Sequence, residues 1–138
     1  MRDKRGAGKG AERRAFSEED LDGMVVAAAS EVHALLGPGL LESAYEECFC
    51  RELELRGIPF RRQVPLPVEY KGAALDCGYR MDVVVADREV VEIVCSGGVT
   101  ALDESRLLTY LRLSGLRAGL IINFHVADLK DGLKRLAL

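Results

Sequence analysis

Two short apolar segments decide the fold of this chain, Tyr79-Arg80-Met81-Asp82-Val83-Val84-Val85 and Val90-Val91-Glu92-Ile93-Val94. The short connection at Ala86-Asp87-Arg88 predicts that they are neighbouring strands of one sheet. Each segment carries one acid, Asp82 or Glu92, among aliphatic side chains. A carboxylate in such surroundings needs a cation, a hydrogen-bond donor or a proton. We therefore expect the hairpin to bring both carboxylates to one spot.

Two adjacent carboxylates suit Mg²⁺ or Mn²⁺, because these ions prefer oxygen ligands and keep several bound waters. One of those waters is able to attack a phosphodiester. The spacing also fits a simpler arrangement, in which one of the two acids faces solvent at a sheet edge. The residues alone leave both readings open.

Helical patterns precede the two segments. Ser17-Glu18-Glu19-Asp20 is typical of a helix cap, and apolar residues then recur at helical spacing until Gly37-Pro38-Gly39 ends the pattern. A second helix is predicted from about Leu40 to Arg56. Its expected buried positions are Leu41, Ala44, Tyr45, Cys48, Phe49 and Leu53.

The remaining elements complete a mixed α/β (α+β) fold. Strands are predicted over Phe60 to Tyr70, Ala74 to Val85 and Glu89 to Cys95, which form a meander, and over Leu116 to Phe124. Helices are predicted from a cap at Asp103 to Leu113 and from Asp128 to about Leu136. The order predicts a three-stranded meander plus a fourth strand, flanked by helices.

Charge divides the chain into two parts. Residues 1–16 hold six of the nineteen Lys and Arg residues but only two of the twenty-two acids, which predicts a disordered basic tail. Residues 17–138, the predicted folded domain, then carry thirteen basic and twenty acidic residues, a net charge of −7. A surface built to coat nucleic-acid backbone is usually basic, so broad non-specific binding by this domain is not expected.

No segment is apolar for long enough to span a bilayer, and no apolar stretch follows the N-terminal charges as in a signal peptide. We therefore expect a cytoplasmic protein. The four cysteines, Cys48, Cys50, Cys77 and Cys95, form no CxxC pair, which favours free thiols over a metal site.

The chain resembles the GxxExxY protein family, a member of the PD-(D/E)XK nuclease superfamily. The signature heptad is Gly39-Leu40-Leu41-Glu42-Ser43-Ala44-Tyr45, and the similarity extends over roughly residues 20–136. Further matching segments are Glu31-Val32-His33, Gln63 to Val68, Tyr70-Lys71-Gly72, Asp76 to Arg80, Leu107 to Leu111 and Leu120 to Phe124.

The resemblance implies a restriction-endonuclease-like core and metal-dependent hydrolysis of phosphodiesters in DNA or RNA. It implies that Asp82 and Glu92 bind Mg²⁺ or Mn²⁺, together with the backbone carbonyl of Ile93. Glu42 would be a further acidic ligand from the second helix. Tyr45 is expected in the same pocket, where its hydroxyl would orient Glu42 or its ring would pack in the core.

Two positions depart from the family pattern. The lysine of the (D/E)XK motif is Val94, and the glutamine of the following helix is Arg106, one turn before Tyr110 of the pocket. An apolar side chain supplies no charge to a transition state, although Arg106 would return a cation to the site. We therefore expect impaired catalysis, and whether the chain is an enzyme stays open. The alternatives are a pseudo-nuclease acting as a binding or regulatory module, and assembly with itself or another protein through the apolar edge at Pro65-Leu66-Pro67.

Overall fold

A computed structural model of the chain describes residues 17–138, so the tail predicted over residues 1–16 lies outside the described part. The helices are α2 (Glu18–Leu36), α3 (Glu42–Leu55), α4 (Ala101–Ser114) and the 3-10 helix η1 (Leu129–Gly132). The strands are β1 (Phe60–Pro65), β2 (Val68–Tyr70), β3 (Ala73–Leu75), β4 (Arg80–Val85), β5 (Glu89–Val94), β6 (Ala118–Asn123) and β7 (Leu133–Ala137). None of the helices within residues 17–138 has the length and apolar character that crossing a membrane requires.

Five strands form one mixed sheet in the order β1-β4-β5-β6-β7. The pairs β1–β4, β4–β5 and β6–β7 are antiparallel, and the central pair β5–β6 is parallel. Helix α4 connects the two parallel strands, as such a crossover requires. The predicted mixed α/β fold, with a meander followed by a strand after a helix, is confirmed.

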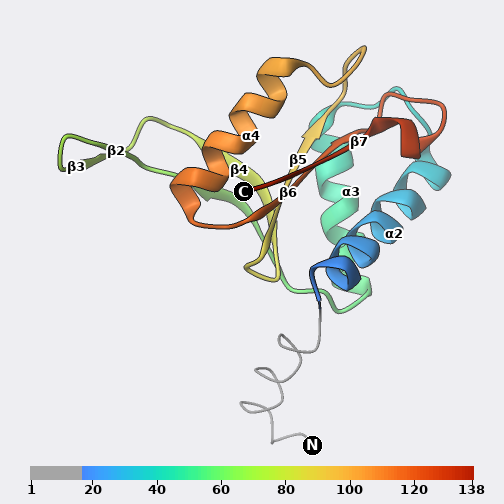
Figure 1. Ribbon diagram of the computed structural model, residues 1–138. Coiled ribbons are helices and arrows are strands. Elements are labelled where there is room, and N and C mark those ends of the chain that lie inside the picture. The colour runs from blue at the N-terminus through green and yellow to red at the C-terminus, as the bar shows by residue number, and fades with distance from the viewer. Residues whose placement is uncertain (1–16) are drawn as a thin grey trace, which may run out of the picture.

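The sheet is covered on both faces (Figure 1), with α2 and α3 on one side and α4 on the other. Successive residues of each strand point to opposite faces, which explains the runs of valine and isoleucine in β4, β5 and β6. Val83 and Val91 pack toward α2 and α3, whereas Val84 and Val90 pack toward Leu107 on α4.

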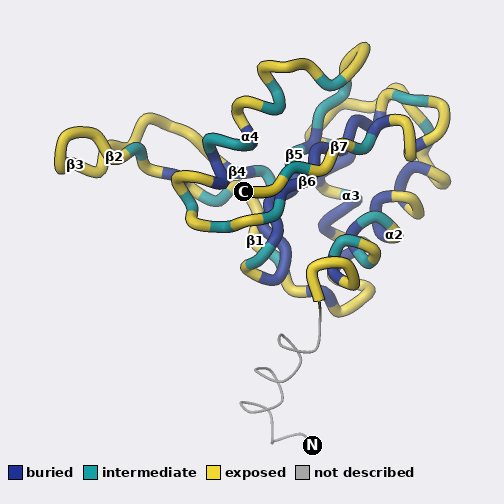
Figure 2. The backbone as a smooth tube through the Cα atoms, viewed as in Figure 1, coloured by how far each residue is buried: buried dark blue, intermediate teal, exposed yellow. Residues whose placement is uncertain are grey.

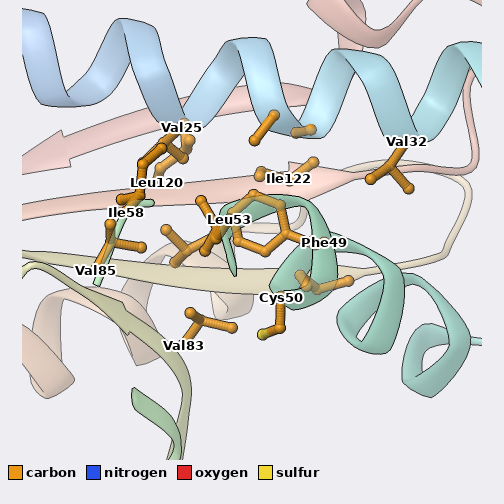
Figure 3. Packing of buried hydrophobic residues seen from close by; sticks show 14 of the residues in the cluster. Val25, Val32, Phe49, Cys50, Leu53, Ile58, Val83, Val85, Leu120 and Ile122 are labelled. Atoms are coloured by element: carbon orange, nitrogen blue, oxygen red, sulfur yellow. The ribbon is translucent and has the colours of Figure 1, made fainter. Parts of the chain in front are cut away.

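The larger core lies between the sheet and the helices α2 and α3. Figure 3 shows Val25 on α2 and Phe49 on α3 meeting Leu120 and Ile122 of β6. Figure 2 shows the same arrangement along the backbone, where buried residues follow the central strands and the inward sides of these helices. Leu41, which was expected in this core, is 76% exposed, because it precedes the first turn of α3 as its N-cap residue.

The two long strands predicted before residue 86 are each divided in the structure. Pro65 ends β1 and Pro67 precedes β2, because proline cannot donate a ladder hydrogen bond. The short strands β2 and β3 pair only with each other, and Figure 1 shows them as an arm that extends away from the sheet.

The prediction for the C-terminal segment is wrong: it is not a helix to Leu136 but one 3-10 turn followed by β7. Asp128 is the N-cap residue of this turn, since its side chain accepts a hydrogen bond from the Lys130 N–H. The chain then pairs antiparallel with β6, from Ile122 opposite Leu133 to Ala118 opposite Ala137. The unpaired edge of β6 therefore determines the conformation of this segment. The predicted cap of α4 is also wrong. The N-cap residue is Thr100, and Asp103 is the third residue of its capping box.

Candidate functional site

Asp82 and Glu92 lie together, as predicted, where β4 and β5 separate. The paired register runs from Val85 opposite Glu89 to Val83 opposite Val91, which places Asp82 facing Glu92. Beyond this point the carboxylates replace the backbone carbonyls as acceptors. Glu92 Oε2 accepts the N–H of Asp82 at 2.9 Å, and Asp82 Oδ2 accepts the N–H of Ile93 at 2.9 Å. Each acid thus uses one carboxylate oxygen to accept a backbone N–H from the neighbouring strand.

A third carboxylate, Glu46 on α3, is joined to this pair through Gln63 of β1. The Gln63 amide nitrogen lies 3.0 Å from Glu46 Oε1 and 3.4 Å from Asp82 Oδ1. Gln63 has a φ of 48°, in the left-handed region that few residues other than glycine adopt. Strained backbone of this kind persists where the surrounding structure holds it and is often found at functional sites.

Glu46 is buried and carries its own counter-ion. Arg62 Nη2 lies 2.9 Å from Glu46 Oε2, and Arg62 Nη1 lies 2.6 Å from Glu47 Oε1. These carboxylates raise the pKa of Arg62, so its guanidinium stays charged. Arg62 therefore balances part of the charge of Glu46, which still raises the pKa values of Asp82 and Glu92.

Glu42, the fourth acid, occupies the first turn of α3 and is exposed. Its Oε2 accepts the N–H of Cys95, the residue after β5, at 3.3 Å. Its negative charge also raises the pKa of Asp82, although less than burial and Glu46 do. Glu42 therefore lies at the border of the acidic site and contributes to its field.

Burial raises the pKa values of both acids, Asp82 and Glu92. Desolvation, followed by the charge of Asp82, raises the pKa of Glu92 to about 8. Desolvation also raises the pKa of Asp82, against the hydrogen bond from Ile93 that favours its ionised form. At neutral pH Glu92 is therefore largely protonated, and the pair carries less than two negative charges.

Helix α4 completes the surroundings of Glu92. Tyr110 is buried, its ring lies edge-on to Tyr79 at 6.4 Å between centroids, and burial and the charge of Glu92 raise its pKa. The charge of Arg106 lowers the pKa of Glu92, yet Arg106 is exposed and its guanidinium pairs with Asp103, with 3.4 Å between Nη1 and Oδ1. Arg106 thus acts on Glu92 through its field.

Val94 is half-buried and packs against the apolar cluster formed with α4, which includes Leu107 and Tyr110. The position that would present a charge to the acids therefore presents two methyl groups. Nothing polar on this side chain is able to orient a water or to attract an anion.

Tyr45 lies outside the acidic site. Its hydroxyl donates to the Gly37 carbonyl and accepts the Leu40 N–H at 3.2 Å, and its ring stacks on Phe124 with centroids 4.4 Å apart. The side chain therefore closes the turn between α2 and α3 and packs in the core. The expectation that its hydroxyl orients Glu42 has no support in these contacts.

The oxygens that a divalent ion would need are only partly free. Within residues 17–138, no three His, Cys, Asp or Glu side chains form a group with metal-ligand spacing. Asp82 and Glu92 each keep one oxygen that is not bonded to a backbone N–H, and Glu46 is occupied by Arg62 and Gln63. Ligation by Glu42, Asp82, Glu92 and the Ile93 carbonyl stays a prediction.

Comparison with known proteins agrees with this fold. The family model described as the PD-(D/E)XK nuclease superfamily matches residues 19–136, and the chain therefore belongs to that superfamily. Nucleases of this superfamily generally use divalent metal ions. Neither the curated proteins nor the solved structures gave a significant match.

Sequence reasoning missed Glu46, Gln63 and Arg62. Glu46 follows Glu42 by one helical turn and lies beside Tyr45 in the sequence, on the face that α3 buries. An acid on an otherwise apolar helix face was the available signal. Nothing in the sequence indicated that Gln63 would adopt a left-handed conformation.

Proposed function

We propose that this chain is a nuclease-fold protein in which hydrolysis of DNA or RNA phosphodiesters is strongly impaired. The observation that carries the proposal is Val94, whose methyl groups pack against the α4 cluster beside an acid pair that is still assembled. Removing one preorganised electrostatic group from a site of this kind costs about a hundredfold or more in rate.

The loss of the lysine has a second effect, on the acid pair itself. A cation two residues after Glu92 on the same strand face would favour the ionised form of this carboxyl. With Val94 there, only the hydrogen bond from the Asp82 N–H and the field of Arg106 oppose the burial and the charge of Asp82, which raise the pKa of Glu92 to about 8. In the metal-free protein Glu92 must therefore lose its proton before it binds Mg²⁺, which prefers charged oxygen donors, so metal affinity should rise with pH.

Cleavage of single- and double-stranded DNA and RNA with Mg²⁺ or Mn²⁺ tests the proposal. We expect slow cleavage by the wild type that Asp82→Ala abolishes, and at least a hundredfold gain for Val94→Lys. Val94→Leu is the matched control, since it keeps an apolar side chain and should show no gain. Circular dichroism confirms that each variant is folded.

The double variant Val94→Lys, Arg106→Gln restores the family pattern at both positions. We expect it to cleave at least as fast as Val94→Lys alone, because Arg106 already bonds to Asp103 and contributes only a field at Glu92. Wild-type cleavage that Asp82→Ala leaves unchanged would come from a contaminant and would contradict the proposal.

The second candidate is a pseudo-nuclease that keeps the fold as a binding or regulatory module. The observation that favours it is the ion pair between Arg62 and Glu46, which gives an acid of the pocket a permanent counter-ion. In this case folded Val94→Lys proteins show no cleavage with either metal ion. The same assay therefore separates the two candidates.

A further inference from the structure

A second acidic site lies at the opposite end of β5, around Glu89. A surface pocket of about 370 Å³ opens there between the first turns of α2, the starts of β5 and β6, and the end of β7. Its charged lining comprises Glu18, Glu19, Asp22, Arg88, Glu89 and Arg135. This volume lies within the range of small-molecule sites.

Glu89 is the feature that the fold leaves unexplained. Its side chain lines the pocket and is only 3% exposed, and its Oε1 atom is buried without a hydrogen-bond partner. A buried polar atom without a partner costs roughly 1–3 kcal/mol, so such atoms are rare in folded proteins. The position of Glu89 on the strand does not require an acid, since Val91 and Ile93 on the same face are apolar.

The surrounding charges select the class of ligand. Four acids and two arginines line the pocket, and Arg135 is already committed to Asp22, with 2.8 Å between Nε and Oδ2. The excess charge is therefore negative. The rest of the lining is apolar and includes Leu21, Leu136 and Ala137.

We propose that this pocket binds a small organic cation, an ammonium or guanidinium group on a short aliphatic stem. The cationic head takes the place of the proton that hydrogen-bonds Glu89 to Asp22 and lies between these two carboxylates, and the stem contacts Leu21 and Leu136. A charge-assisted hydrogen bond to a buried carboxylate is stronger than one between neutral groups, which suits a ligand of this size. The proposal does not depend on nuclease chemistry, because the pocket and the Asp82–Glu92 pair are at opposite ends of β5.

Binding of this kind depends on pH. Burial, followed by the charge of Asp22 and by the hydrogen bond between the two carboxyl groups, raises the pKa of Glu89 to about 8, while Arg135 opposes this and Glu18 adds to it. Glu19 and Arg88 also face the pocket. A cation binds the ionised carboxylate, so its affinity rises between pH 7 and pH 9.

The test uses n-butylguanidinium and n-butylammonium as probes, titrated into the ¹⁵N-labelled full chain and followed by amide chemical shifts. We expect saturable shifts at Glu89 and Gly119, with n-butanol at least about tenfold weaker because it lacks the charge. Glu89→Gln should weaken the probes by at least about tenfold. The control Glu54→Gln changes an exposed acid on α3 and should leave the affinity unchanged.

Two further sets of variants complete the test. Ala137→Leu fills the pocket from an exposed position and should also block binding, which covers the case that Glu89→Gln fails to fold. Arg13→Gln with Arg14→Gln, close to α2 in the sequence, should leave the affinity unchanged. A several-fold gain in affinity for the probes would mean that an arginine of the chain competes for the pocket. It would overturn the proposal that the ligand is a separate molecule. Equal affinity of Glu89→Gln and wild type, or no saturable shift in the wild type, would also overturn it.

Discussion

Glu89 and Glu92 lie three residues apart on β5, on opposite faces of the sheet, and burial raises the pKa of each to about 8. Their surroundings nevertheless differ. Glu92 Oε2 accepts the N–H of Asp82, whereas Glu89 Oε1 has no partner. Equal pKa values therefore arise from different physical situations. The Glu92 carboxyl joins two strands, whereas the Glu89 carboxyl bonds to the side chain of Asp22 beside a pocket.

The largest expected effect of the two raised pKa values is on the pH dependence of the free energy of unfolding. Both folded-state pKa values lie above the ordinary 4.5, so the folded protein binds more protons than the unfolded chain between pH 4.5 and about 8. The stability that this supplies is present below pH 4.5 and is lost as the pH rises toward 8. We expect the free energy of unfolding to fall by roughly a few kcal/mol across this window.

Urea unfolding at several pH values checks this for the wild type, Glu89→Gln and Glu92→Gln. Each variant should lose a large part of the pH dependence, because each removes one raised titration. The two variants together should leave only the part that the raised pKa of Asp82 supplies. A wild-type protein that gains stability from pH 5 to pH 8 would contradict the raised pKa values.

A smaller effect separates the acidic neighbours of the two glutamates. Asp82→Ala leaves the Ile93 N–H without its acceptor and should destabilise the fold by about 1–3 kcal/mol. Asp22→Ala removes an ion pair with the half-exposed Arg135 and should cost about 0–1 kcal/mol. Urea unfolding at pH 6 measures both, since Glu89 and Glu92 are still largely protonated there. Equal costs would mean that Asp82 has no special role in joining β4 and β5.

The smallest effects should come from removing Arg106 or Arg135, and each change should alter the pKa of one glutamate only. Arg106→Gln should raise the pKa of Glu92 further and leave that of Glu89 unchanged. Arg135→Gln should raise the pKa of Glu89 and leave that of Glu92 unchanged. Carbon-detected NMR titration of the side-chain carboxyls reads both values. Parallel movement of the two pKa values would show that the sites are not independent.

The sequence predicted the parts of this structure that depend on local patterns. The cap at Ser17, the hairpin that joins Asp82 to Glu92, and the buried strand through Leu120 all follow from residue spacing or turn chemistry. The C-terminal strand did not, because Leu133 and Leu136 also suit a helix. Only the unpaired edge of β6, a feature of the assembled sheet, decides between the two.

The site was predictable to the same degree. Asp82 and Glu92 stand out because they interrupt apolar strands, and their proximity follows from one tight turn. Glu46 and Gln63 reach the site from α3 and β1, and no local pattern indicates which side chains of separate elements will meet. Glu89 was read as the start of a strand, and its burial depends on how α2 and β7 pack over it.

The central claim is that the acid pair Asp82–Glu92 is assembled and that the apolar Val94 beside it limits hydrolysis. Cleavage of DNA and RNA with saturating Mg²⁺ or Mn²⁺ by Val94→Lys, with Val94→Leu as the reference, tests it most directly. The account predicts at least a hundredfold faster cleavage by folded Val94→Lys and no gain for Val94→Leu. Equal rates for the two folded variants would contradict it.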